Sequence, residues 1–127
     1  TGYAQLATMI KASSLAREGD LDSALIDFSE LLDASSGIFG NEMLSSIAKI
    51  NIARIELSKK NYTDVLKTLE SFNSNSEHSL VYEIKGDALL GLQKNDLALD
   101  QYSLALENTQ NESQKSLIKM KINRVNN

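Results

Sequence analysis

The chain has 127 residues, of which 42% are hydrophobic and 24% charged, and its 13 basic and 17 acidic side chains give a formal net charge of −4. This acidic balance argues against a nucleic-acid partner, because phosphate contacts need clustered Lys and Arg. The lack of Cys excludes a disulfide framework and a thiolate metal site. No apolar run exceeds three residues, whereas a membrane-spanning helix needs ~20, so the chain is expected to be soluble.

Helical periodicity runs along the whole sequence. Pro is absent, and apolar residues recur at intervals of three and four, as in Leu25, Phe28, Leu31 and Leu32. Start and stop signals predict about seven helices. They span roughly residues 2–17, 21–34, 41–59, 61–72, 76–92, 95–107 and 111–125.

Short polar residues mark the expected helix starts. The predicted N-caps are Asp20, Asn41, Asn61, Ser76 and Asn95. The segment 109–112, Thr-Gln-Asn-Glu, has the spacing of a capping box for the last helix. Gly19 is predicted to end the first helix in the left-handed conformation. The loop 35–40 carries Ile38 and Phe39, which are expected to tuck back onto the core.

An internal repeat is the strongest signal in the sequence. Ala24, Val65 and Ala98 share a register at spacings of 41 and 33 residues. Small residues stand twelve positions earlier, and bulky ones four positions later: Ala12, Ala53 and Gly86, then Phe28, Leu69 and Tyr102. Small residues let two antiparallel helices approach closely, and the bulky residue fills the gap beside them. The sequence therefore predicts repeated helix-turn-helix units.

The repeat divides the chain into parts of one predicted domain. These parts are repeat 1 at about 2–34, a loop at 35–40, repeat 2 at about 41–72, repeat 3 at about 76–108 and a capping helix at about 111–125. The expected fold is all-α, a right-handed solenoid of about three helical hairpins with the capping helix at its C-terminal end.

The repeat resembles the tetratricopeptide repeat, whose period is about 34 residues. The resemblance rests on Gly19-Asp20 and Asn61-Tyr62 at two inter-helix turns and on the third unit. That third unit reads Tyr82, Gly86, Leu89, Ala98, Tyr102 and Ala105. The sequence departs from the family pattern at Thr8 and Lys49, where a large apolar residue is usual, and in lacking the proline at each repeat end.

The tetratricopeptide resemblance implies a groove lined by the first helix of each pair. The exposed groove positions would be Met9, Ser13, Ile50, Arg54, Glu83 and Asp87. Such a groove takes an extended or helical segment, with Met9 and Ile50 offering adaptable apolar contact. The alternative is that Met9 and Ile50 merely pack between helices. Because Arg54 is the lone cation of this set, an unstructured apolar or basic client fits better than a C-terminal carboxylate.

The last helix combines an apolar set with basic residues. Its apolar residues are Leu117, Ile118, Met120, Ile122 and Val125, and its basic ones are Lys115, Lys119, Lys121 and Arg124. We expect this helix to cover the open end of the stack. The alternative is a basic helix for an acidic partner or a lipid surface.

Read together, segments along nearly the entire chain resemble the YfgM-type ancillary subunit of the SecYEG translocon. They are residues 82–90, 52–57 and 120–123. This resemblance implies a periplasmic domain of a bacterial inner-membrane protein that acts with translocon subunits, a periplasmic chaperone or an exported client. The chain starts at Thr1 without a signal segment, so the N-terminal anchor would lie upstream.

Residues for catalysis are sparse. His78 is the only histidine, and a single imidazole cannot supply a multi-His metal site; it is expected to be a solvated residue at a helix start. Glu83 and Asp87 lie one turn apart and would suit acid–base work, although such a pair more often forms a polar helix surface. No catalytic, cofactor or metal site is therefore predicted.

The sequence favours a non-enzymatic protein-interaction module. The alternatives are a general tetratricopeptide scaffold or adaptor in the cytosol or envelope, and, less favoured, an enzyme using Glu83 and Asp87. Homo-oligomerisation through an uncapped end remains a further alternative.

Overall fold

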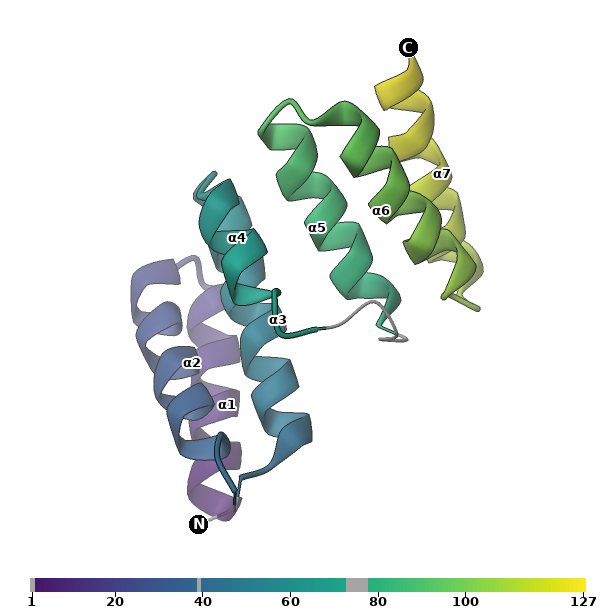
Figure 1. The fold of residues 1–127 in the computed structure, drawn as a ribbon. Helices are drawn as coiled ribbons and strands as arrows, with labels where there is room; N and C mark the ends of the chain where they lie inside the picture. The colour runs from purple at the N-terminus through teal and green to yellow at the C-terminus, as the bar shows by residue number, and fades with distance from the viewer. Residues whose placement is uncertain (1, 39, 73–77) are drawn as a thin grey trace. The chain divides into compact units, whose positions relative to one another are not determined.

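A computed structural model describes residues 2–38, 40–72 and 78–127, and Figure 1 shows its helices. Within these ranges the chain forms seven helices and no strand, which confirms the all-α class. The helices are α1 (Gly2–Arg17), α2 (Leu21–Ser35), α3 (Glu42–Ser58), α4 (Tyr62–Thr68), α5 (Ser79–Gly91), α6 (Asn95–Glu107) and α7 (Glu112–Asn126). None of these described helices is long and apolar enough to cross a membrane.

The chain divides into two compact units, Thr1–Ile55 and Glu56–Asn127. In the first unit, α1 and α2 form a hairpin. Its core joins Ala12 of α1 and Phe28 of α2 to Ala48 and Ile52 of α3, all of them buried. Met9 packs against this core.

In the second unit, α5 and α6 form the central hairpin, with α4 beside α5 and α7 beside α6. Tyr82 of α5, Tyr102 of α6 and Ile118 of α7 meet in one buried cluster. The Oγ of Ser79 donates to the backbone oxygen of Ala105 at 2.7 Å, so the start of α5 is tied to the end of α6. That bond satisfies two polar groups inside the protein, where they would otherwise be costly.

The aligned repeat positions are buried, as the repeat predicts. Ala24, Val65 and Ala98 are fully buried, and so are their bulky partners Phe28, Leu69 and Tyr102. Ala12 and Ala53 are likewise inaccessible, and Gly86 is buried against the ring of Tyr102. The grouping of the repeats into one domain stays a prediction.

Three of the inter-helix turns, α1–α2, α3–α4 and α5–α6, share one main-chain conformation. Gly19, Lys60 and Gln93 have φ values of 88°, 61° and 62°, in the left-handed region. The next residue in each turn donates its N–H to the carbonyl five positions back: Asp20 to Leu15, Asn61 to Glu56 and Lys94 to Leu89, each at 2.9 Å. This pattern is the Schellman C-cap, which satisfies carbonyls at the helix end. The left-handed ending predicted for Gly19 is confirmed, and it recurs at a lysine and a glutamine.

Several predicted boundaries need correction. α4 ends at Thr68 rather than near Phe72, because the chain continues into tight turns, with Glu70 N bonded to the Lys67 oxygen. Lys94, not Asn95, is the N-cap of α6. Asn111, not Thr109, caps α7, and its side chain accepts the N–H of Gln114.

Other N-caps fall where the sequence placed them. The Asp20 carboxylate accepts the N–H of Ser23 at 3.2 Å, and Asn41 Oδ1 accepts that of Leu44 at 3.0 Å. Asn61 is the N-cap of α4 but forms no side-chain cap bond. The predicted cap at Ser76 lies outside the described residues.

The loop between α2 and α3 differs from expectation. Ile38 is 96% exposed, so its predicted packing on the core is wrong, while Phe39 lies outside the described residues. The loop is closed by main-chain bonds instead: Gly40 N donates to the Gly37 oxygen and Asn41 N to the Ser35 oxygen, at 3.1 and 2.8 Å. A Cβ at Gly40 would lie 2.1 Å from that same Ser35 oxygen, so the close approach requires glycine.

Candidate functional site

Four of the six predicted groove residues belong to the first unit and differ in exposure. Arg54 of α3 is exposed, whereas Ser13 of α1 and Ile50 of α3 are half-buried. Met9 is half-buried against the α1–α2 core, so it also has the packing role that was its alternative. Their part in binding a partner stays a prediction.

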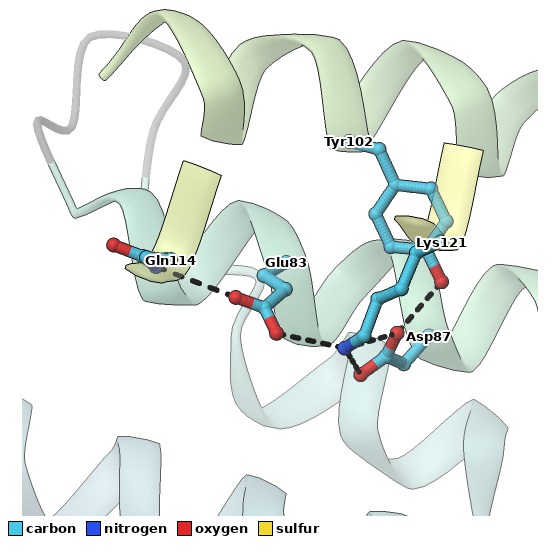
Figure 2. A network of polar contacts seen from close by, with 5 residues as sticks. All are labelled: Glu83, Asp87, Tyr102, Gln114 and Lys121. Atoms are coloured by element: carbon cyan, nitrogen blue, oxygen red, sulfur yellow. Dashed lines mark hydrogen bonds and ion pairs between the residues drawn. The ribbon is translucent and has the colours of Figure 1, made fainter. Parts of the chain in front are cut away.

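The other two predicted groove residues, Glu83 and Asp87, converge on a lysine of α7 (Figure 2). Lys121 Nζ lies 2.7 Å from Glu83 Oε2 and 3.0 and 2.9 Å from the two oxygens of Asp87. The hydroxyl of Tyr102 donates to Asp87 Oδ1 at 2.6 Å, and Gln114 Nε2 donates to Glu83 Oε1 at 3.3 Å. Three helices, α5, α6 and α7, thus contribute to one polar network, hereafter the Lys121 network.

Glu83 is only 7% exposed, so the expectation that it faces an open groove is wrong. Its side chain and that of Asp87 are covered by α7 and neutralised in part by one ammonium. Charge-assisted bonds of this kind are stronger than neutral ones. The pair therefore fastens the last helix to the α5–α6 hairpin, and this contact gives α7 the structural role expected of a cap.

The network shifts two pKa values. Burial by itself would lower the pKa of Lys121, but the hydrogen bonds and negative charges of Glu83 and Asp87 outweigh burial, so its pKa is raised. Burial, together with the bond and charge of Asp87, also raises the pKa of Tyr102. Tyr102 is consequently a hydroxyl donor and Lys121 a cation at neutral pH.

The arrangement does not resemble acid–base machinery. Both carboxylates already bind Lys121, and His78 stands apart as the N-cap of α5, with its ring 5.6 Å from that of Phe72 in an edge contact. Among the described residues there is no group of three or more His, Asp or Glu that could hold a metal. A general acid or base must reach a substrate proton, and here the acidic oxygens face a lysine instead.

From the sequence, Lys121 was grouped with the other basic residues of the last helix and was not paired with Glu83 or Asp87. A signal was present, because Lys121 stands three residues after Ile118 and four before Val125, at the spacing of one helix surface. Ile118 is fully buried, and Val125 packs against the same cluster. A cation inside such an apolar stripe indicates a buried acidic partner.

We expect the network to make stability fall at high pH. A lysine whose folded-state pKa is raised stabilises the fold fully below its unfolded value, near 10.5 here, and loses that effect as pH rises through the folded value. Thermal unfolding should be followed from about pH 9 to about pH 12 for the natural chain and Lys121→Met. The difference in melting temperature should shrink above about pH 10.5. Deprotonation of Tyr102 affects both proteins. A difference in melting temperature that stays constant with pH would contradict the raised pKa of Lys121.

A family model for a tetratricopeptide repeat-like domain matches residues 1–127. The chain belongs to this tetratricopeptide repeat-like family. The shared register of buried small and bulky residues and the three equivalent turns are the structural counterpart of that match. Members of the family are built from helical hairpins, and for this repeat-like chain the assignment supports a protein-interaction role.

Two curated proteins are similar to this tetratricopeptide repeat-like chain, and both are named ancillary SecYEG translocon subunit. One, from Buchnera aphidicola subsp. Schizaphis graminum (strain Sg), is 28% identical over 97% of the chain. The other, from Buchnera aphidicola subsp. Acyrthosiphon pisum (strain APS), is 24% identical over 95% of it. The chain spans 61% of the length of each relative. The resemblance first seen in short segments is thereby confirmed along nearly the whole chain.

Proposed function

We propose that this chain is a non-catalytic protein-binding domain of an ancillary SecYEG translocon subunit. The observation that carries the proposal is the similarity to two proteins of that name, which extends over 95–97% of the chain. In the proposed arrangement the domain lies in the periplasm, is held at the inner membrane by a segment upstream of it, and handles a periplasmic chaperone or an emerging exported protein.

The binding surface is proposed to include α1 and α3 of the first unit. Arg54 is exposed, and Ile50, half-buried on the same helix, provides apolar area beside that charge. An apolar surface with an occasional charge suits an unstructured client, because apolar contact gives affinity and charge gives orientation. Glu83 and Asp87 are left out of this surface, since Lys121 already engages both.

Co-purification tests the proposed partners. The protein that carries this chain, tagged and extracted from membranes in mild detergent, should retain SecYEG subunits or a periplasmic chaperone. A photo-crosslinking residue at Arg54 should give adducts with them, whereas the same residue at Leu117, a 42% exposed position on α7, should give few. Recovery of neither a translocon subunit nor a chaperone would overturn the proposal, and equal crosslinking at both positions would overturn the α1–α3 surface.

A further inference from the structure

A hollow of about 480 Å³ lies on the second unit between α4, α5 and α6. Its size falls in the range of about 300–1,000 Å³ that is usual for ligand pockets. Leu66 after the first turn of α4 and Leu89 of α5 give it an apolar wall. Polar groups line the rest of it: Thr63, Lys67, Glu70, Lys85 and Gln101.

The cations of the hollow outnumber its acid. The lining contains two lysines, Lys67 and Lys85, and one carboxylate, that of Glu70. It therefore carries a net positive charge in a chain whose net charge is −4. Lys85 is half-buried, and its Nζ donates to the backbone oxygen of Phe72 at 3.3 Å. An ammonium has three donors, so this long bond leaves capacity for an incoming acceptor. Burial lowers the pKa of Lys85, and an anion placed beside it would offset that cost.

Gln101 supplies an unmet acceptor. Its Oε1 is buried and has no hydrogen-bond donor among the described residues. Buried acceptors without a donor are costly, so such an atom in the wall of a hollow indicates that a donor arrives from outside.

We propose that the hollow between α4, α5 and α6 binds an internal segment of a partner protein in which a carboxylate side chain adjoins an apolar one. The carboxylate pairs with Lys85 and Lys67, and the apolar side chain packs on Leu66 and Leu89. Gln101 Oε1 and the Glu70 carboxylate accept backbone N–H groups of the partner on the two sides of its acidic residue. The acidic residue therefore lies within the partner's chain and not at its C-terminus. The inference rests on the proposed protein-binding function and adds the chemistry of one partner segment.

The direct test is an NMR titration of the ¹⁵N-labelled chain with a blocked peptide, acetyl-Gly-Ser-Leu-Asp-Leu-Ser-Gly-amide. Shifts should be concentrated at the amides of Leu66, Leu89 and Gln101. The peptide with Asn in place of Asp keeps shape and loses charge, and it should bind about fivefold more weakly, as expected for one partly screened ion pair. Equal binding of the two peptides, shifts confined to other helices, or no binding of the acidic peptide would overturn the proposal. Inorganic phosphate that displaces the peptide would indicate a simple anion site and would also overturn it.

Variants separate the contacts. Lys85→Met keeps the apolar stem and should weaken the acidic peptide about fivefold, with no effect on the Asn peptide. Lys119→Met removes an exposed cation of α7 and should change neither. Gln101→Leu should leave the free chain as stable as before or more stable, because the orphaned oxygen is gone, yet it should weaken the peptide. A Gln101→Leu chain that binds as well as the natural one would overturn the role of Gln101.

Failure of the proposal is distinguishable from failure of the proposed function. If Lys85→Met still co-purifies with SecYEG subunits at the natural level while the peptide does not bind, the hollow is not a binding site and the translocon role stands. If co-purification fails for the natural protein, the peptide titration still decides whether the hollow binds an acidic segment.

Discussion

Replacing Gly86 by leucine should lower the free energy of unfolding of the second unit by about 2–3 kcal/mol. A Cβ at this position would lie 2.5 and 2.6 Å from Cε1 and Cδ1 of Tyr102, well inside van der Waals contact. The ring cannot move aside cheaply, because Tyr102 is fully buried and its hydroxyl is bonded to Asp87. The better helix propensity of leucine, roughly 1 kcal/mol, offsets only part of the clash.

Hydrogen exchange of the α5 and α6 amides measures this loss locally. Gly86→Ala should show a smaller effect of about 1 kcal/mol, because only the Cβ is added. Gly2→Ala is the control: nothing lies within 4 Å of its Cβ, and its change should stay within about 0.5 kcal/mol. If Gly86→Leu has no greater effect than Gly2→Ala, the close approach of α5 and α6 at this residue is refuted.

Replacing Lys121 by methionine should destabilise the second unit by about 1–3 kcal/mol. Methionine preserves the apolar stem but leaves Glu83 and Asp87 facing each other without a cation. Removal of one member of a fully buried pair costs about 3–5 kcal/mol. Lys121 and Asp87 are 21% and 24% exposed in their side chains, so solvent screening reduces the effect here.

Two further variants isolate the cause. Lys115→Met is the matched control on α7, because its partner Glu112 is 86% exposed and the pair should contribute less than about 0.5 kcal/mol. Lys121→Met combined with Glu83→Gln and Asp87→Asn removes the unpaired charges and should recover most of the lost stability. Exchange protection of the α7 amides is the measurement. Lys121→Met that leaves this protection unchanged would show that the network does not hold the last helix.

Local rules predicted the helices well. The end of α1 and the start of α2 follow from Gly19 and from the capping residue Asp20, so the sequence alone placed them. The repeat register was also readable, since Ala24 and Phe28 share a helix and their burial follows from spacing. α6 was harder, because Lys94 takes the N-cap position through main-chain geometry and contributes no side-chain cap bond.

The candidate sites depended on contacts that spacing within one helix does not reveal. Glu83 and Lys121 are 38 residues apart and meet only because α7 packs on the α5–α6 hairpin. The groove prediction treated Glu83 as exposed because it considered α5 without the helix that covers it. The hollow beside Lys85 is likewise formed by three helices, and neither Lys85 nor Gln101 carries a motif that distinguishes it in the sequence.

The turns at Gly19, Lys60 and Gln93 have an evolutionary consequence. At Gly19, Lys60 and Gln93 the peptide backbone makes the turn, and three chemically unrelated residues occupy the same turn position. A gene segment that encodes one hairpin therefore also encodes its own turn. This turn requires no particular residue in the neighbouring hairpins. Duplication or loss of such a segment leaves every remaining turn intact. Arrays of helical hairpins can therefore diverge in sequence while the chain keeps the same path.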